Sequence, residues 1–571
     1  MENYRTQAEK WILSDKVSKE VKDEINGLDD TALKVRFSDF MSFGTAGLRA
    51  EMGAGTAFMN VYTVAHATMG LAKLVCGMGS EAMARGAVIA YDSRNNSALF
   101  ARRAAEVLSA EGIKVYLFSE LRPTPVLSFA VRELGCVVGI NITASHNPKK
   151  YNGYKAYFED GAQLSPENAK TVSEAMATLD IFDDVPTPDK ANQDLIIMLG
   201  RDFDEKYLEK VLAESVNPDA IREVADELEI VYTPLHGAGT RLVPEVLRRA
   251  GLKKLFTVQS QMEPDGNFPT LTYPNPEFPE AFDEGIKIAK RENCDLIIAT
   301  DPDADRVGVM ARGKDGDFRC ITGNQMGALL IDYVINAYEK LNAMPKAPYA
   351  VKTIVTSEMA AEICKSHGIK MYNVLTGFKF IGEVIKNHEK SGEGTFLLGF
   401  EESYGYLKGT YARDKDAVVA SLLITEMAAY YRKKGMTLSD ALEALFERYG
   451  YFRESVTNIV MDTPDGKERM AVMMAKLRKE PLSSIGEEKI VEFRDYKTGE
   501  VTNTVTGEKS PTGLPSSDVI YYVTESGHVI VVRPSGTEPK VKIYVLTRGN
   551  TAEAAKADAD KCLEEIRKIV S

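Results

Sequence analysis

Cysteine is scarce in this chain, and none of it stands in the close pairs that bind zinc or build a disulfide framework. The 571 residues include six cysteines and no CxxC pair: Cys76, Cys136, Cys294, Cys320, Cys364 and Cys562. Scattered thiols of this kind are typical of reduced cysteines in the cytosol. We therefore expect structural thiols and a cytoplasmic protein.

Long apolar runs are also missing. No segment approaches the ~18 apolar residues that a membrane-spanning helix needs. The first 16 residues carry Glu2, Glu9 and Asp15 and lack the apolar stretch of a secretory signal. The sequence thus predicts neither a membrane span nor a secretory signal.

An excess of positive charge is absent as well. The net charge is -13 and the isoelectric point is about 5.3. Because binding to nucleic acid requires a basic face, this balance argues against a nucleic-acid partner. An anionic small molecule stays possible, since a local basic cleft can exist in an acidic protein.

What the chain does contain is an alternation of strand-like and helix-like segments. Residues 86–91 and 114–118 are strand-like, and the helical pattern of residues 99–111 lies between them. This rhythm predicts βαβ units with mainly parallel sheets. A chain of 571 residues is too long for one hydrophobic core, so we expect three to five domains.

Polar loops follow three of the apolar runs. Ser145 lies shortly after the run 136–140, Asp301 after the run 295–299, and Glu401 after the run 395–398. Ligands of open α/β sheets bind at the carboxyl ends of the strands. We therefore expect the three loops, one per domain, to converge on one central cleft.

The first loop displays a serine in the hexapeptide Thr-Ala-Ser-His-Asn-Pro at 143–148. A serine hydroxyl can carry a transferable group once a base or metal activates it. His146 is adjacent, but neighbours on an extended segment point to opposite sides, so a Ser-His triad is not expected. A simple hydrogen-bonded turn is the alternative interpretation.

The second loop is acidic. Asp301, Asp303 and Asp305 alternate, so an extended loop would place the three carboxylates on one side, where hard oxygen ligands suit Mg²⁺. An EF-hand is excluded, because Arg306 and Arg312 occupy the positions of its glycine and glutamate. A phosphatase with Asp301 as nucleophile and a solvated turn remain as alternatives.

Several further segments offer phosphate or sugar contacts. Residues 533–539 read Arg-Pro-Ser-Gly-Thr-Glu-Pro, which suits either a phosphate nest or a hairpin turn. Asp92-Ser93-Arg94 follows a strand and can be a surface turn. Other candidate contacts are Arg49 after a glycine-rich turn, Lys379 beside aromatic residues, and Glu401 and Ser403 in the third loop.

Together these motifs resemble the α-D-phosphohexomutase superfamily, and most closely its phosphoglucomutase/phosphomannomutase branch. The match runs from Phe43 to about Tyr544 with the motifs in family order. The resemblance implies three related mixed α/β domains and a C-terminal α+β domain that clamps phosphate, arranged around a central cleft. The expected limits are residues 1–200, 201–318, 319–450 and 451–571.

The resemblance also implies a reaction and its residues. The family interconverts glucose 1-phosphate and glucose 6-phosphate through a phosphoserine and a bound glucose 1,6-bisphosphate, with one Mg²⁺ per chain. Ser145 is similar to the phosphorylated serine and metal ligand, beside the metal ligands Asp301, Asp303 and Asp305. The implied catalytic partners are His146, Lys155 and Arg306. The implied substrate contacts are Arg49, Lys379, Glu401, Ser403, Arg533, Ser535, Gly536 and Thr537.

Two departures from the family pattern bear on the substrate. Phe400 stands where glycine often precedes the first glutamate, and Lys542 stands where many relatives have arginine. Residues 411–416 are similar to a longer subgroup with phosphopentomutase-like members. Phosphopentomutase or phosphomannomutase activity is therefore an alternative, and a Mg-dependent sugar phosphatase or a non-catalytic sugar-phosphate sensor is a more remote one. Sugar phosphates are the expected partners of a monomer or homodimer.

Lys155, which the resemblance assigns to proton transfer, would need a lowered pKa for that role. The ordinary pKa of a lysine is about 10.4, so proton transfer by Lys155 near neutrality requires nearby cations or burial to lower it.

Two segments show how the chain is divided. Residues 180–193 are rich in aspartate and proline and are typical of a linker or surface insertion. The tail predicts strands at 528–533 and 541–546 and an amphipathic helix over 551–570, capped by Asn550 or Thr551.

Overall fold

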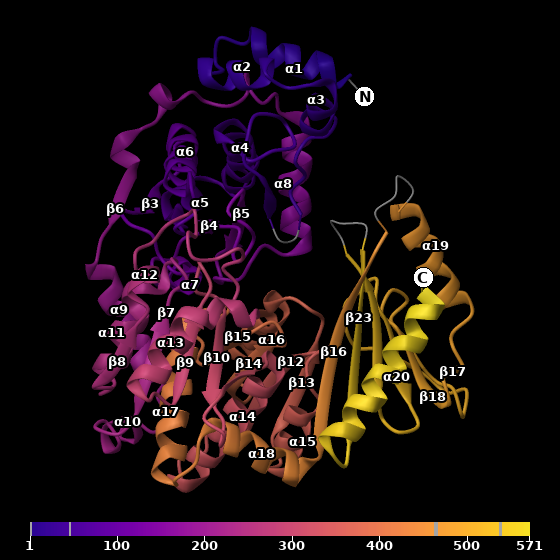
Figure 1. The fold of residues 1–571 in the computed structure, drawn as a ribbon. Helices are drawn as coiled ribbons and strands as arrows, with labels where there is room; N and C mark the ends of the chain where they lie inside the picture. Colours follow the sequence, from indigo (N-terminus) through magenta and orange to yellow (C-terminus); the bar gives the residue numbers. More distant parts are fainter. Residues whose placement is uncertain (1–2, 45–46, 462–465, 536–539, 571) are drawn as a thin grey trace.

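The computed structural model describes residues 3–44, 47–461, 466–535 and 540–570 (Figure 1). Within them the chain forms four β-sheets with helices, arranged as three mixed α/β units followed by a C-terminal unit dominated by one antiparallel sheet. The expected fold class is confirmed. In the described part of the chain, no helix combines the length and the apolar character needed to cross a membrane.

Three short helices precede the first sheet and cap one end of the molecule (Figure 1). They are α1 (Tyr4–Leu13), α2 (Lys19–Asn26) and α3 (Asp30–Phe37). Buried Trp11 packs against Phe37 and against Phe182 of the 180–193 segment. The interpretation of that segment as a linker or surface insertion is therefore wrong for its apolar residues, which belong to the core under this cap.

The first sheet has the strand order β1-β5-β4-β2-β3-β6. Its strands are β1 (Leu48–Glu51), β2 (Ala87–Tyr91), β3 (Val115–Phe118), β4 (Val138–Ile142), β5 (Tyr151–Phe158) and β6 (Ile196–Leu199). The accompanying helices are α4 (Val61–Gly77), α5 (Ser80–Arg85), α6 (Ser97–Ala110), α7 (Thr124–Glu133) and α8 (Pro166–Thr178). The central strands β2 and β4 are almost wholly apolar because helices cover both faces of a parallel sheet.

The second sheet repeats the plan in the order β11-β10-β9-β7-β8. Its strands are β7 (Glu229–Thr233), β8 (Lys254–Thr257), β9 (Leu296–Thr300), β10 (Val307–Arg312) and β11 (Phe318–Ile321). The helices are α9 (Asp202–Ala213), α10 (Ala220–Glu223), α11 (Gly239–Arg249), α12 (Gln259–Met262) and α13 (Asp283–Glu292).

The third sheet has the order β13-β12-β14-β15. Its strands are β12 (Pro348–Thr353), β13 (Lys370–Val374), β14 (Thr395–Glu401) and β15 (Gly405–Leu407). The helices are α14 (Gly323–Lys340), α15 (Met359–Ser366), α16 (Phe378–Ser391), α17 (Ala417–Lys433) and α18 (Leu438–Tyr449). Strand β14 extends to Glu401, so this residue ends the strand and does not lie in the loop where the apolar pattern placed it.

The three sheets share one local topology. Strands β2, β7 and β12 each pair in parallel with a strand that then turns back into an antiparallel neighbour. The three returning pairs are β4–β5, β9–β10 and β14–β15. The loops of interest connect these pairs, so they occupy equivalent positions in three related sheets.

The fourth sheet is antiparallel and stands apart at one side of Figure 1. Its strands are β16 (Tyr451–Val460), β17 (Ser484–Ile485), β18 (Glu488–Asp495), β19 (Glu500–Asn503), β20 (Lys509–Pro511), β21 (Ile520–Thr524), β22 (Val529–Pro534) and β23 (Lys540–Gly549). Helices α19 (Gly466–Lys479) and α20 (Ala552–Val570) accompany it. The predicted C-terminal helix is confirmed, and the Thr551 hydroxyl caps it by accepting the Ala554 N–H at 3.1 Å.

The hydrophobic core reflects this division. One continuous cluster joins the first three units, with Val88, Ile298 and Leu398 from the three sheets among its members. The C-terminal unit has a core of its own, and a smaller cluster attaches it to the third unit. The first three units are thus fused through apolar contact, whereas the fourth is joined across a limited interface.

Candidate active site

Ser145 lies in the loop between β4 and β5, and its side chain points at the acidic loop of the second unit. Its Oγ donates a hydrogen bond to Asp301 Oδ2 at 2.8 Å. The residue is buried and has a φ of 51°, a left-handed conformation that is uncommon for a residue with a Cβ. The Thr143 hydroxyl accepts the Ser145 N–H at 2.8 Å and helps to hold this turn.

His146 contacts the serine directly. The prediction that the two side chains point to opposite sides is wrong, because the left-handed Ser145 bends the chain and brings His146 Nδ1 to 3.1 Å from the serine Oγ. Burial and the surrounding cations, led by Arg306, Arg49 and Arg94, hold the pKa of His146 well below its usual value. The low pKa favours the neutral form of the imidazole.

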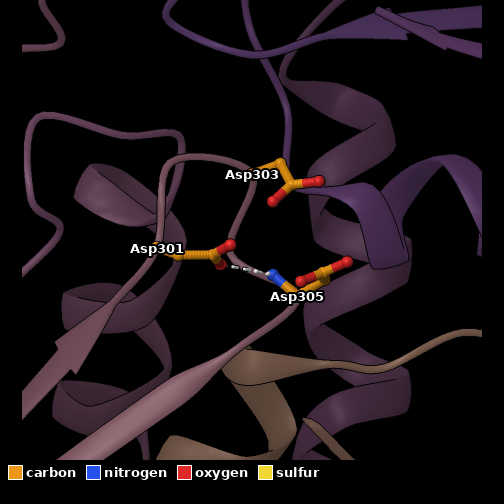
Figure 2. A group of neighbouring side chains, drawn as sticks. All are labelled: Asp301, Asp303 and Asp305. Atoms are coloured by element: carbon orange, nitrogen blue, oxygen red, sulfur yellow. Dashed lines mark hydrogen bonds between the residues drawn. The ribbon is translucent and has the colours of Figure 1, made fainter. Parts of the chain in front are cut away.

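The acidic loop connects β9 to β10 and gathers three buried carboxylates (Figure 2). Asp301, Asp303 and Asp305 each supply an oxygen atom, and these atoms lie within 4.8 Å of one another. The loop is a compact turn and not the extended segment expected from the sequence: Ala304 has a φ of 48°, and the Asp305 N–H donates to Asp301 Oδ1 at 3.2 Å. The carboxylates nevertheless converge.

The chemistry of this cluster fits a divalent cation. Asp303 Oδ1 and Asp305 Oδ1 are buried and lack a hydrogen-bond partner, which is costly unless a ligand satisfies them. Burial, together with the two neighbouring carboxylates, raises the pKa of Asp301 well above its usual range. Hard oxygen donors of like charge in this arrangement suit Mg²⁺.

Two lysines approach the carboxylates from other elements. Lys155 of β5 places its Nζ 2.9 Å from Asp303 Oδ2 and 3.4 Å from Asp305 Oδ2. Lys415 lies 3.2 Å from Asp305 Oδ2. Burial by itself lowers the pKa of Lys155, but the carboxylates outweigh it and the pKa is raised. The expectation that its surroundings lower this pKa is wrong, because anions and not cations dominate around its Nζ.

Arg306 and Glu401 occupy the side of the site toward the third unit. Arg306 pairs with Glu277 and lies close enough to influence Glu401. Burial raises the pKa of Glu401 to about 7. The Gly377 N–H donates to Glu401 Oε1 at 2.8 Å, which joins the start of α16 and its half-buried Lys379 to the end of β14.

The remaining predicted contacts lie at the edges of this region. Arg49 of β1 is exposed and donates to Asn147 Oδ1 of the serine loop at 3.0 Å. Ser403 is half-buried in the β14–β15 turn. In the fourth unit, Arg533 lies beside Tyr544, whose pKa is raised by burial and by the carboxylate of Glu402.

The predicted phosphate loop of the fourth unit is described only in part. The Ser535 N–H donates to the Lys540 carbonyl at 2.8 Å and closes its two ends. Gly536 and Thr537 lie outside the described residues.

Sequence reasoning missed Arg94 as a residue of the site. The interpretation of Asp92-Ser93-Arg94 as a surface turn is wrong, since Arg94 is 3% exposed. Its guanidinium donates to four carbonyls of the serine loop and of the start of β5: Ser145, Asn147, Pro148 and Tyr151. The sequence offered one indication of this role: like the other loops of the site, Arg94 comes directly after a strand.

Thr124 and Lys415 were also missed. The Thr124 hydroxyl donates to Asp303 Oδ2 at 2.8 Å and in turn accepts from Asn141 at 2.7 Å. Thr124 begins α7 and carries no local motif, so nothing in the sequence singles it out. Lys415 lies in the 411–416 segment that the sequence presented only as a subgroup feature.

A serine hydroxyl against a triad of buried carboxylates, with a histidine and several cationic side chains around it, suits metal-assisted phosphoryl transfer. Family models agree with that class along the chain. Residues 41–181, 205–314 and 322–449 match the α/β/α domains I, II and III of phosphoglucomutase/phosphomannomutase, and residues 468–562 match its C-terminal domain.

Curated relatives and solved structures support the same assignment. A phosphoglucomutase of Staphylococcus saprophyticus is 36% identical over 515 residues, which cover 89% of this chain and 90% of the relative. One from Staphylococcus epidermidis is 36% identical over 530 residues, or 92% and 94% of the two chains. The fold is similar to that of a Paramecium phosphoglucomutase, pp63/parafusin in an open form, with a TM-score of 0.68, 18% identity, and 92% and 95% coverage. The chain belongs to the phosphoglucomutase/phosphomannomutase family.

Proposed function

We propose that this protein interconverts glucose 1-phosphate and glucose 6-phosphate through a phosphoserine at Ser145 and a bound glucose 1,6-bisphosphate. The observation that carries the proposal is the contact of Ser145 Oγ with Asp301 at 2.8 Å and with His146 at 3.1 Å, inside the carboxylate triad. A phosphoryl group on this oxygen would lie directly beside the three acidic side chains. Its negative charge would be unfavourable there without a cation.

One Mg²⁺ per chain is the proposed cation, held by Asp301, Asp303, Asp305 and an oxygen of phosphorylated Ser145. When bound, it neutralises charge on the transferring phosphoryl group, which is most of what the loose transition state of such a transfer requires. The Nε of Arg306 lies 3.9 Å from Asp305 Oδ1, so its guanidinium adds a second positive charge beside the triad.

Two side chains are placed to move the proton of the sugar hydroxyl. Lys155, whose Nζ lies 2.9 Å from Asp303 Oδ2, is the proposed carrier of this proton, and His146, whose Nδ1 lies 3.1 Å from Ser145 Oγ, assists it. In the proposed cycle, phosphorylated Ser145 gives its phosphoryl group to the free hydroxyl of the sugar phosphate, and the hydroxyl loses its proton to the protein. The bisphosphate then turns over, and the other phosphate returns to Ser145 as its own sugar oxygen takes up a proton.

The substrate contacts are proposed from their positions around this centre. Arg49 lies beside the serine loop, and Lys379, Glu401 and Ser403 lie in the third unit, where they would read sugar hydroxyls. The idle phosphate would be held by residues of the fourth unit: Arg533, Ser535, Gly536 and Thr537. This arrangement is the proposed central cleft, and residues 1–200, 201–318, 319–450 and 451–571 are the proposed domain limits.

Two further proposals concern the cellular location and the alternative substrate. The six cysteines are unpaired thiols, which supports a cytoplasmic enzyme of sugar metabolism. A pentose phosphate or mannose phosphate is the alternative substrate, with the same mechanism.

A coupled assay tests the function. Purified protein with Mg²⁺ and a trace of glucose 1,6-bisphosphate receives glucose 1-phosphate, while mannose 1-phosphate and ribose 1-phosphate run in parallel and free phosphate is monitored. We expect isomerised product without free phosphate, fastest with glucose 1-phosphate. Free phosphate released in proportion to the substrate consumed would favour a phosphatase with Asp301 as nucleophile.

Ser145→Ala tests the nucleophile. We expect turnover to fall by at least about 1000-fold while the affinity for glucose 1-phosphate stays within about tenfold, because only the transferring oxygen is removed. Rates come from the coupled assay and affinities from calorimetry. Ser119→Ala, at an exposed serine bonded to the Leu199 carbonyl, is the control and should remain fully active. Intact turnover in Ser145→Ala would refute the assignment.

A further inference from the structure

A groove on the first unit lies outside the site described above. It has a volume of about 340 Å³ and is formed between α4, α6 and the 180–193 segment, close to the end of α1. We call it the N-terminal groove. Its lining residues are Lys16, Val61, Tyr62, Ala65, Leu99, Arg102, Arg103, Glu106, Ile181, Phe182, Val185, Thr187 and Pro188.

The floor of the groove is apolar and preformed. Phe182 and Val185 come from the 180–193 segment and are buried, and Tyr62 of α4 packs edge-to-face on Phe182. Leu99 of α6 lies at the rim and exposes 53% of its surface, which is high for a leucine beside an apolar depression. Such a floor favours a flat apolar body over a polar sugar.

The rim is positively charged. Lys16, Arg102 and Arg103 line the groove together with one acidic residue, Glu106. Lys16 is already engaged by the Phe182 carbonyl at 2.7 Å and by the Asp183 carboxylate at 3.0 Å, and Arg102 is engaged by Glu106 at 3.2 Å. Arg103 donates through one nitrogen to the Pro186 carbonyl, but its Nη1 is buried without a hydrogen-bond partner, 3.6 Å from Glu106.

We propose that the N-terminal groove binds a small amphipathic anion, with a flat aromatic or alicyclic body on the Phe182 floor and one anionic group on Arg103. A buried donor without a partner is costly, and an anion would satisfy it with a charge-assisted bond. With Asp183 counted, three cations and two carboxylates lie at this rim, in a chain whose net charge is -13. None of the residues that line the groove belongs to the proposed phosphoryl-transfer site.

The chain contains its own reporter for this groove. Trp11 is the single tryptophan, and its ring lies 5.2 Å from that of Tyr62 and 5.4 Å from that of Phe182. The probe is 1-anilinonaphthalene-8-sulfonate, an aromatic monoanion, titrated into the full-length protein. Binding in the groove should quench Trp11 emission while the probe's own emission rises, with a single common midpoint.

Two variants and one control locate the probe. Arg103→Gln should weaken probe binding about tenfold, which corresponds to the loss of one charge-assisted bond. Leu99→Glu, at an exposed position that leaves the core intact, should weaken it at least about fivefold by charge repulsion. Arg222→Gln on α10, an exposed arginine far along the chain, should leave the affinity unchanged.

Three results would overturn the proposal. The first is unchanged affinity in both Arg103→Gln and Leu99→Glu. The second is equal affinity for the uncharged analogue N-phenyl-1-naphthylamine, which would remove the role of the anion. The third is displacement of the probe by glucose 1-phosphate, which would place it in the phosphoryl-transfer site.

Discussion

At the scale of single residues, the site depends on a serine held in an unfavourable backbone conformation. A non-glycine residue with a left-handed φ costs of order 1 kcal/mol, so the surroundings must fix it. Arg94 does so by holding the carbonyls of Ser145 itself and of Asn147 after it, and buried Asp92 lies 3.5 Å from its Nε. Arg94 is therefore a positioning residue, since it holds the backbone that carries Ser145, the proposed nucleophile.

Arg94→Lys tests that role. A lysine keeps the charge but cannot bond four carbonyls in a plane, so the serine loop should lose its fixed geometry. We expect kcat to fall about 100-fold with KM changed less than about threefold. The fraction of Ser145 phosphorylated by glucose 1,6-bisphosphate, measured by intact mass, should fall in parallel. Full kcat in Arg94→Lys would show that the loop holds its conformation without this clamp.

Asp301→Asn tests the metal site through stability and not only through activity. Mg²⁺ that binds the folded protein alone must raise its melting temperature. We expect Mg²⁺ to raise the melting temperature of the unaltered protein and to leave that of Asp301→Asn nearly unchanged. Without Mg²⁺ the variant should be at least as stable, because one of three mutually repelling buried carboxylates is gone. Asp315→Asn, on an exposed turn, is the matched control, and an equal Mg²⁺ shift in Asp301→Asn would contradict the metal assignment.

At the scale of elements, the site is built from the same connection used three times. The β4–β5 and β9–β10 turns present the serine and the carboxylates, and the β14–β15 turn, with Glu401 at the end of β14, presents the proposed sugar contacts. Each turn follows a strand whose neighbour runs parallel to it, so its residues emerge at the carboxyl edge of the sheet. Packing between loops then sets their mutual distances.

Gly237 shows how close that packing is. It lies in the turn before α11, and a Cβ added there would come within 2.4 Å of the Pro302 Cα in the acidic loop. Gly237→Ala must therefore displace the acidic loop. We expect at least a tenfold loss of apparent Mg²⁺ affinity and a loss of about 1–3 kcal/mol in stability, measured by activity titration and denaturant unfolding. Gly200→Ala, where a Cβ meets nothing within 4 Å, is the control. Unchanged Mg²⁺ affinity would mean that the loop tolerates the shift.

At the scale of the whole molecule, the fused core of the first three units contrasts with the separate core of the fourth. Residues of β21 alternate between two environments, as the period of a strand requires. Tyr522 packs into the core of the fourth unit, whereas Tyr521 packs into the cluster that it shares with Ile354 and Val355 of the third unit. The fourth unit is thus held by few apolar contacts, which suits a domain that opens and closes over a substrate.

The two tyrosines give a matched pair of variants. Tyr521→Ala should weaken the interface by about 3–5 kcal/mol and separate the thermal unfolding of the fourth unit from that of the rest. Tyr522→Ala should instead lower the stability of the fourth unit itself. Differential scanning calorimetry distinguishes them, and a single unshifted transition in Tyr521→Ala would show that the interface contributes little.

The sequence by itself determined the class of the fold and the local motifs. Alternating apolar runs specify strands buried on both faces, and the polar residues that follow them must lie at strand ends, so Ser145 and the three aspartates could be selected without a structure. The amphipathic period of the last helix was sufficient to place it and to narrow its cap to Asn550 or Thr551, of which the structure selects Thr551. These features depend on neighbours in the chain, which a sequence displays directly.

Only the tertiary structure decided which distant groups meet and how the loops are bent. The left-handed turn at Ser145 brings His146 onto the hydroxyl, and Arg94 is buried because its partners are carbonyls more than fifty residues away. Whether Lys155 has a raised or lowered pKa depends on the carboxylates beside its Nζ, which come from another sheet. Such properties follow from distances between segments far apart in the chain, and no local pattern of residues encodes them.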